Sequence, residues 1–198
     1  PTGAGAACAG TVYYYLFAPQ FHPKKTVYIY IDRDDTADSI YNKVEQQGHP
    51  RSFTGFRWMA QYKKYSENIH TGRYAIRPGE NVYHVFSRLY RGYQEPTNLT
   101  VGSVRTLDRL ARSVGKQLMI DSTEIAGLMN DSAFQQKLGY NKETMACLFI
   151  PETYQVYWDM SVEGFLQADA ERTSEILEPK AARPSQSHRY DPGRGVHT

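Results

Sequence analysis

Residues 149–154 read FIPETY and are followed by QVYW at positions 155–158, and this stretch is the most informative part of the chain. Pro151 cannot continue a hydrogen-bonded ladder, so we expect the backbone to turn there. The turn presents Glu152 and Tyr154 from an extended segment walled by aromatic side chains. Rings beside a carboxylate are typical of sugar sites, because pyranose faces stack on rings while hydroxyls hydrogen-bond to acids. They are equally typical of a Tyr-rich core, and the residues alone leave both interpretations open.

Downstream of this stretch the chain changes character after residue 167. We expect a helix to begin near Ser161 and to carry Phe165 and Leu166. Residues 168–198 contain no Phe or Trp and are rich in Pro, Arg, Ser, Gly and His. Such a segment cannot bury enough apolar surface to order itself, so we predict a disordered tail over 168–198.

Upstream of the stretch, residues 104–140 have a helical pattern. Apolar side chains recur every three to four positions, and Asp121 with Glu124 resembles a capping box before an apolar run. Asp131 is expected to open a further short helix that ends at Gly139. This part of the chain is therefore predicted to be mainly helical.

The first half of the chain alternates strand and helix patterns. Residues 27–31 and 72–76 are predicted strands, and the turn pair Pro78-Gly79 closes the second. A strand over 98–101 is expected to complete a small α+β unit. The expected helices begin after Asp34-Asp35-Thr36, Ser52 and Asn81, and the second of them is expected to carry Phe53, Phe56, Met59 and Tyr62 near one face.

Composition limits the classes of function that fit. The 198 residues suit one domain or two small ones, and a net charge of +2 with scattered Lys and Arg argues against nucleic acid as a partner. The 16 Tyr and 8 Phe fit a carbohydrate or peptide surface and equally an aromatic core. The six His are dispersed, so no metal is expected. Cys8 falls in an apolar N-terminal segment, so we expect no disulfide between it and Cys147.

The N-terminal segment is apolar. Residues 4–17 carry no charge, end in a cluster of Tyr, and are followed by Lys24 and Lys25. They are fewer than the roughly 20 residues that span a bilayer, so we interpret residues 1–22 as the remnant of a membrane anchor. A frayed apolar terminus or a signal-peptide remnant is the alternative. In the anchor interpretation, everything after Lys25 lies outside the cytoplasmic membrane.

The pattern Gly72-x-Tyr74-x-Ile76-x-Pro78-Gly79, followed by a capped helix, resembles a LysM-type element. Such elements are small βααβ modules that bind polymers containing N-acetylglucosamine. The resemblance implies glycan contacts for Gly72, Tyr74, Pro78 and Gly79.

The order of these features resembles one family, the endolytic murein transglycosylases, also called the MltG or YceG-like family. An apolar anchor, a strand–helix–helix unit, the LysM-type pattern, the strand at 98–101 and a [FI]-P-[DE]-T-Y segment follow one another from about Tyr13 to Leu166. The resemblance implies an α+β fold with a mainly helical second part. The expected parts are an anchor remnant (1–22), a LysM-like domain (26–102), a partial catalytic domain (103–167) and the tail (168–198).

This resemblance implies a single-pass protein of the bacterial cytoplasmic (inner) membrane with its domains on the outer side. Members cleave nascent peptidoglycan strands internally, between N-acetylmuramic acid and N-acetylglucosamine, and leave an anhydro ring. One Glu acts first as acid and then as base. The implied partners are glycan strands, the membrane and peptidoglycan synthases, and no cofactor is implied. The implied substrate-binding residues are Glu152, Thr153, Tyr154 and Tyr157.

The chain departs from the family pattern at the catalytic residue. The family's catalytic Glu lies in a helix downstream of the P-[DE]-T-Y segment, and no matching stretch follows residue 154. One back-translation of residues 175–192, shifted by a nucleotide, resembles the lead-in to that helix, so we hypothesise a frameshift after Gln167. The chain as written is then expected to lack lytic activity. The alternatives are a natural tail, a non-catalytic, membrane-tethered peptidoglycan-binding module, and a divergent enzyme with Glu152 as its acid.

Overall fold

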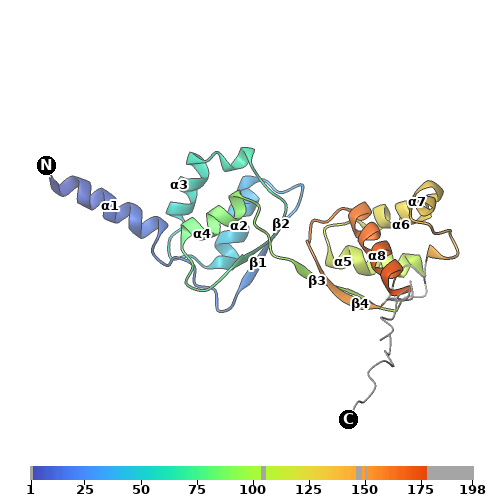
Figure 1. Cartoon of the computed structure of the whole chain (residues 1–198). Helices are drawn as coiled ribbons and strands as arrows, with labels where there is room; N and C mark the ends of the chain where they lie inside the picture. The colour runs from blue at the N-terminus through green and yellow to red at the C-terminus, as the bar shows by residue number, and fades with distance from the viewer. Residues whose placement is uncertain (1, 104–105, 146–148, 150, 178–198) are drawn as a thin grey trace, which may run out of the picture.

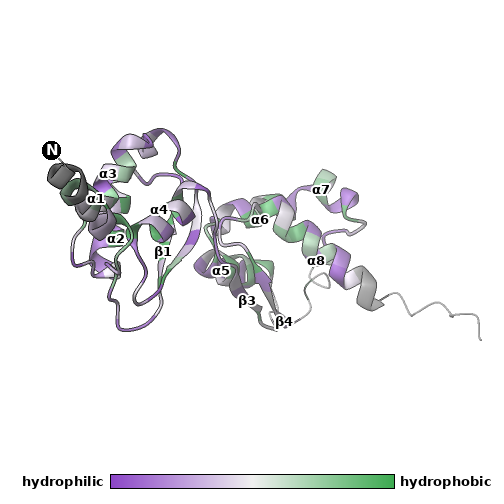
Figure 2. Ribbon diagram, turned by 60° about the vertical axis from the view of Figure 1, so that its left-hand side comes forward, coloured by the Kyte–Doolittle hydropathy of each residue, from purple (hydrophilic) through white to green (hydrophobic). Residues whose placement is uncertain are grey.

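The computed structural model describes residues 2–103, 106–145, 149 and 151–177. Within these residues the chain forms two lobes, which lie side by side in both ribbon views (Figure 1, Figure 2). Each lobe has its own hydrophobic core. The helix α1 (Thr2–Leu16) precedes the first lobe and points away from the second (Figure 1). Helices and small antiparallel sheets make up both lobes, so the predicted α+β class is confirmed.

The first lobe (residues 20–96) is built on a two-stranded antiparallel sheet. β1 pairs with β2 from Val27 opposite Ile76 to Ile31 opposite Gly72, which are the predicted bounds of both strands. Two helices lie between the strands in sequence and a third follows them. The elements are β1 (Val27–Ile31), α2 (Ala37–Gly48), α3 (Thr54–Tyr62), the 3-10 turn η1 (Tyr65–Glu67), β2 (Gly72–Ile76) and α4 (Val82–Tyr90).

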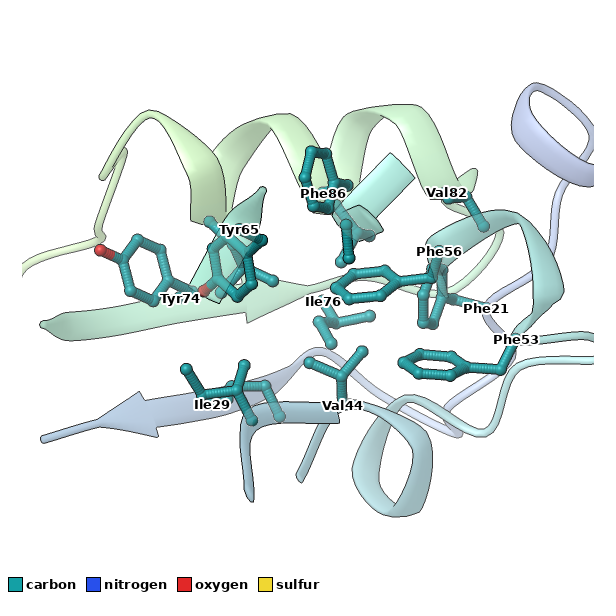
Figure 3. Packing of buried hydrophobic residues seen from close by; sticks show 14 of the residues in the cluster. Phe21, Ile29, Val44, Phe53, Phe56, Tyr65, Tyr74, Ile76, Val82 and Phe86 are labelled. Carbon is teal, nitrogen blue, oxygen red and sulfur yellow. The ribbon is translucent and has the colours of Figure 1, made fainter. Parts of the chain in front are cut away.

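The core of the first lobe is rich in aromatic rings. Phe56 stacks on Phe53 with ring centroids 4.7 Å apart and meets Phe86 edge-on at 5.4 Å (Figure 3). Tyr62 was expected near the face of Phe56, but it is 83% exposed. That prediction is wrong because Tyr62 lies six residues after Phe56. This separation rotates its side chain by about 240° around the helix axis relative to that of Phe56, away from the core. The inward face of α4 consists of Val82, Val85, Phe86 and Leu89.

Side chains at the helix starts explain why α2 and α4 begin where the sequence predicts. Thr36 accepts a hydrogen bond from the Ser39 amide, and the Ser39 hydroxyl accepts one from the Thr36 amide, which together form a capping box. The Asn81 side chain accepts a hydrogen bond from the His84 amide at 2.8 Å. Each cap satisfies backbone donors that the first turn of a helix leaves free.

The second lobe (residues 97–177) has its own small sheet and an aliphatic core. β3 pairs with β4 in antiparallel register, with Leu99 opposite Tyr154. The strand near 98–101 therefore does not complete the first unit as expected, because Leu99 and Val101 are buried in the core of the second lobe. The elements are β3 (Thr97–Val101), α5 (Leu107–Gln117), α6 (Ser122–Asn130), α7 (Ser132–Lys137), β4 (Glu152–Val156) and α8 (Val162–Leu177).

The prediction of a disordered tail from residue 168 is wrong for its first part, because α8 includes residues 168–177. This helix begins beside Ser161 as expected but continues to Leu177, past the change of composition at residue 167. Asp169 and Thr173 are buried within it, at 3% and 1% exposure. The stretch 168–178 contains neither Pro nor Gly, so a helix can form there despite the composition of the segment as a whole. Residues 178–198 lie outside the described part of the chain.

The N-terminal boundary also differs from the prediction. Gln20 and Phe21 were assigned to the anchor remnant, yet both are buried in the first lobe. The Phe21 carbonyl accepts a hydrogen bond from the Gly79 amide at 2.8 Å, which ties this segment to the turn after β2. In the described residues, none of the helices has both the length and the apolar character needed to span a membrane.

Candidate functional site at the junction of the lobes

The predicted substrate-binding residues lie on β4 and at its end. Glu152 and Thr153 are exposed, and the Thr153 hydroxyl lies 3.0 Å from the hydroxyl of Thr100 on β3. Tyr154 occupies the middle of the strand, and the position of its side chain lies outside the described part. Tyr157 is 52% exposed just after the strand. The stretch after Pro151 is extended, as predicted, and it leads directly to the contact between the lobes.

The loop after β4 joins the second lobe to the first. The Asp159 carboxylate accepts hydrogen bonds from the Thr71 hydroxyl and the Gln94 side-chain amide, both at 2.8 Å. Beside it, Trp158 meets Tyr30 of β1 edge-on, with ring centroids 5.1 Å apart. A single loop thus contributes both a polar and an aromatic contact across the junction.

Two of the predicted LysM-type glycan contacts instead support this junction. Gly72 has φ +138°, and a Cβ there would lie 2.7 Å from Oε1 of Gln94, so only glycine leaves room for that side chain. Tyr74 is 1% exposed, and its hydroxyl is hydrogen-bonded to the Thr71 carbonyl at 2.9 Å. Burial raises the pKa of the Tyr74 hydroxyl above its ordinary value, and nearby Asp159 raises it further. Neither residue offers surface to a glycan, because both are buried.

The other two predicted contacts, Pro78 and Gly79, are exposed. They follow the far end of β2, whereas Gly72 begins that strand beside the junction. The four residues of the LysM-type pattern therefore do not form one surface. If Pro78 and Gly79 contact glycan, they do so at a place separate from the junction.

A cleft of about 370 Å³ lies between the lobes at this contact. One wall is the loop that follows β1 in the first lobe. The other wall is the start of α6 together with the loop after β4 in the second lobe. We call this the junction cleft, and it is lined by Asp32, Arg33, Asp34, Met119, Asp121, Glu124 and Trp158.

Two of the carboxylates in the junction cleft accept hydrogen bonds from nearby backbone amides. Asp121 accepts a hydrogen bond from the Thr123 amide at 2.8 Å and so caps α6. That hydrogen bond lowers the pKa of Asp121 and keeps the group ionised. Asp32 accepts a hydrogen bond from the Asp34 amide at 3.0 Å. In the described part of the chain, the carboxylates of Asp34 and Glu124 make no hydrogen bond or ion pair, so both are free to accept from a ligand.

The junction cleft combines an aromatic surface with oxygen acceptors. Trp158 is only partly buried, and the exposed guanidinium of Arg33 adds a hydrogen-bond donor. A ring to stack against and carboxylates to accept hydrogen bonds from hydroxyl groups are what a sugar requires. A carboxyl that protonates a glycosidic oxygen must be held in a closed, partly apolar site. Glu152 is exposed on β4 and lacks such surroundings.

Sequence reasoning identified only part of this site. Trp158 belongs to the aromatic run at 155–158, but the sequence assigns Asp34 and Asp121 to helix capping alone. Asp121 does cap its helix, and its place in the cleft follows from the packing of the two lobes. The strongest signal for the junction was the aromatic pair at 157–158, directly after the predicted strand.

A second cavity of about 300 Å³ lies between α7 and α8 in the second lobe. Phe134, Leu138 and Tyr140 form part of its lining, and Glu163 and Gln167 come from α8. It contains none of the residues to which the sequence assigned a role. We therefore place the candidate site at the junction cleft.

Together, the fold and the cleft define a two-lobed α+β protein with an acidic and aromatic site where the lobes meet. The sequence model of the YceG-like family matches residues 29–196, a range that includes most of the first lobe and all of the second and continues past residue 167. The chain belongs to the YceG-like family.

Among solved structures, the chain is similar to the 2.6 Å crystal structure of a yceG-like protein, lmo1499, from Listeria monocytogenes. The sequence identity is 18% and the TM-score is 0.42. The similarity covers 78% of this chain and 56% of that one, so this chain spans little more than half the length of that structure. None of the curated proteins compared with the chain matches it.

Proposed function

We propose that this chain is the glycan-binding part of an endolytic peptidoglycan lytic transglycosylase. Such an enzyme cleaves bonds between N-acetylmuramic acid and N-acetylglucosamine in nascent strands and leaves anhydro ends. Membership of the YceG-like family supports the class of reaction. The observation that carries the proposal for this chain is the junction cleft, where Trp158 and the carboxylates of Asp34 and Glu124 meet from two lobes.

In this proposal the described residues hold the glycan rather than cleave it. The reaction needs one carboxyl that first donates a proton to the glycosidic oxygen and then accepts the proton of the muramic 6-hydroxyl. Glu152 is exposed, and Asp121 is held ionised by its helix cap, so neither suits that alternation. Glu152, Thr153 and Tyr157 then extend the glycan surface along β4 from the junction cleft.

The first lobe takes the role of a LysM-like module in this proposal. Its two helices between antiparallel strands fit a βααβ module, and Pro78 with Gly79 is the exposed part of the motif. We propose that α1 is inserted in the outer side of the cytoplasmic membrane, because residues 4–17 carry no charge. Both lobes then face nascent glycan strands and the synthases that produce them.

Binding to purified sacculi tests the junction cleft. Trp158→Ala is expected to weaken co-sedimentation roughly threefold to tenfold, the loss typical of an aromatic contact. The double variant Asp34→Asn with Glu124→Gln is expected to weaken it further, because amides accept hydrogen bonds from hydroxyls less strongly than carboxylates do. Trp58→Ala, in the first lobe and outside the cleft, is the matched control. Equal binding by all three variants contradicts the proposed site.

Analysis of soluble products separates binding from catalysis. Purified chain incubated with glycan strands is expected to release no anhydro-muropeptides. Release that disappears in Glu152→Gln would show instead that Glu152 is the acid of a divergent enzyme. The alternative function, a non-catalytic peptidoglycan-binding module, is favoured by the exposure of Glu152. It predicts no release even from the longest form of the protein that the gene encodes.

The Asp159 contact tests whether the cleft depends on the relative position of the lobes. Asp159→Ala removes the acceptor of both junction hydrogen bonds, each worth about 1.5–3 kcal/mol for a charged acceptor. We expect weaker binding to sacculi together with a larger radius of gyration by small-angle X-ray scattering. Asp38→Ala, an exposed acid on α2, is the control and should change neither quantity.

A further inference from the structure

The helix α1 is packed directly onto the first lobe. A Cβ at position 55 would overlap the carbonyl oxygen of Tyr15, so Gly55 lets α3 touch the backbone of α1. Tyr15 also meets Trp58 edge-on, with ring centroids 5.2 Å apart. The Gln20 side-chain amide donates to the Tyr14 carbonyl at 2.7 Å. These contacts fix the direction of α1 relative to the lobe.

Exposed apolar side chains gather around this contact. Ten large hydrophobic side chains are exposed in the described residues, and seven of them lie on or just after α1 and on α3 and α4. Trp58 and Tyr62 are one helical turn apart on α3, with 45% and 83% of their surfaces exposed. The seven are Val12, Tyr13, Tyr14, Phe17, Trp58, Tyr62 and Tyr83.

Positive charge accompanies these aromatic residues. Residues 51–64 contain Arg51, Arg57, Lys63 and Lys64 and no acidic residue. The Lys63 ammonium lies 5.5 Å from the centre of the Tyr62 ring. Exposed Trp and Tyr with adjacent Lys are typical of protein surfaces at the level of lipid headgroups, where rings and cations both find partners.

The direction of α1 places this surface at one end of the molecule. In Figure 1, α1 extends from the end of the first lobe that is remote from the second, and α3 lies beside the base of the helix. A surface into which α1 inserts would therefore meet α3 before any part of the junction cleft. Phe17 and Tyr83, which pack at 5.5 Å, continue the same surface from α1 to α4.

We propose that the face formed by Trp58, Tyr62 and Tyr83, with Lys63 and Lys64, is a contact surface for anionic phospholipid headgroups. The inference rests on the membrane insertion of α1 proposed above, and it adds that the folded lobe itself touches the bilayer. The aromatic rings lie among the headgroups, and the two lysines pair with lipid phosphates. The first lobe is then held against the membrane at two places, α1 and α3.

The only two tryptophans of the chain lie in different lobes, so each lobe can be monitored separately. The chain with Trp158→Phe retains Trp58, and the matched control with Trp58→Phe retains Trp158. Each is mixed with vesicles of phosphatidylcholine and phosphatidylglycerol, with and without bromine on the acyl chains. An environment-sensitive dye on Cys8, in a Cys147→Ser background, reports the insertion of α1 independently.

The proposal expects bromine to quench Trp58 and to leave Trp158 unchanged, while the Cys8 dye shifts to the blue. The Lys63→Gln, Lys64→Gln double variant is expected to lose about fivefold in vesicle partitioning for each lysine removed. A dye shift without quenching of Trp58 would overturn the contact surface but leave α1 inserted. No dye shift would overturn the membrane placement itself. Self-association that depends on Trp58, without quenching, would identify a second copy of the chain as the occupant.

Discussion

The two lobes reach a buried core by different means. The first packs rings against rings, and five ion pairs join residues of this lobe. The second packs mainly aliphatic side chains from β3, α5, α6 and α8 around two Phe residues. Among the side chains that the structure describes, the buried rings of the first lobe are Phe21, Phe53, Phe56, Tyr65, Tyr74 and Phe86, and those of the second are Phe134 and Phe165.

This difference in packing indicates which lobe is the more stable. Rings bury large areas and gain additional energy from edge-on and stacked contacts, about 0.5–1.5 kcal/mol for each pair. In the first lobe, Arg88 in the last turn of α4 also donates two hydrogen bonds to Glu80 in the turn after β2, at 2.6 and 2.9 Å. We therefore expect the first lobe to be the more stable, with the second depending more on the junction contacts of Asp159.

The largest expected effect comes from opening the aromatic core. Phe56→Ala removes the ring that contacts both Phe53 and Phe86, and we expect a loss of about 3–5 kcal/mol in the first lobe. Unfolding followed through Trp58 should shift more than unfolding followed through Trp158, which lies in the second lobe but also contacts Tyr30 of the first. Phe165→Ala is the matched change in the second lobe and should give the opposite result. Shifts of equal size at both tryptophans would show that the lobes unfold as one unit.

A smaller effect is expected at the ion pair between Glu80 and Arg88. Burial alone would raise the pKa of Glu80, but the hydrogen bonds from Arg88 and from the Arg77 amide outweigh it and lower the pKa. Glu80 therefore stabilises the fold above its ordinary pKa, and this stability is lost as pH falls through the lower pKa of the folded state. We expect Arg88→Met to cost about 2 kcal/mol at neutral pH, below the usual cost of breaking a fully buried pair.

Chemical denaturation between pH 3 and pH 7 checks this ion pair. The stability of the first lobe should rise with pH in the parent chain and rise less in Arg88→Met. Arg57→Met is the control, because its pair with Glu45 is 3.9 Å long and half exposed and should contribute little. A pH profile unchanged by Arg88→Met would mean that other carboxylates, such as that of Asp35, govern the acid stability of this lobe.

The smallest expected effect compares equivalent helix caps in the two lobes. Thr36 caps α2, and Thr106 caps α5 through the Arg109 amide. Replacing either Thr with Ala should cost about 1 kcal/mol, because a backbone donor loses its partner. Each loss should appear only in the lobe that carries the substitution, as read from Trp58 or Trp158. A loss from Thr106→Ala that reaches Trp58 would show that stability passes across the junction.

Much of the fold follows from local sequence patterns. The bounds of β1 and β2 and the caps at Thr36 and Asn81 agree with the structure, because side-chain alternation and capping residues act over a few positions. The pairing of β3 with β4 joins segments more than fifty residues apart, and no local pattern specifies it. The same limitation explains why the strand near 98–101 was assigned to the wrong unit.

The site was less predictable than the fold. The sequence marked Gly72 and Tyr74 by resemblance to a glycan-binding motif, but their burial depends on how Gln94 and Thr71 pack at the junction. The junction cleft combines three segments from two lobes, and the carboxylate of Asp121 already has a local role as a cap. A residue with a satisfied local role gives no sign in the sequence of a second one.

The contact between Gly55 and Tyr15 has a mechanical consequence. The two ends of a flexible tether of ten residues lie roughly 15–20 Å apart on average, and their separation varies. Here the backbone of α1 lies directly against α3 of the first lobe, so the position of α1 relative to that lobe is fixed. With α1 inserted in the membrane as proposed above, the folded protein sets the distance from the membrane to the junction cleft. In that proposed arrangement the cleft meets only glycan strands at that distance from the membrane, and Gly55→Val would separate α1 from α3 without altering any residue of the cleft.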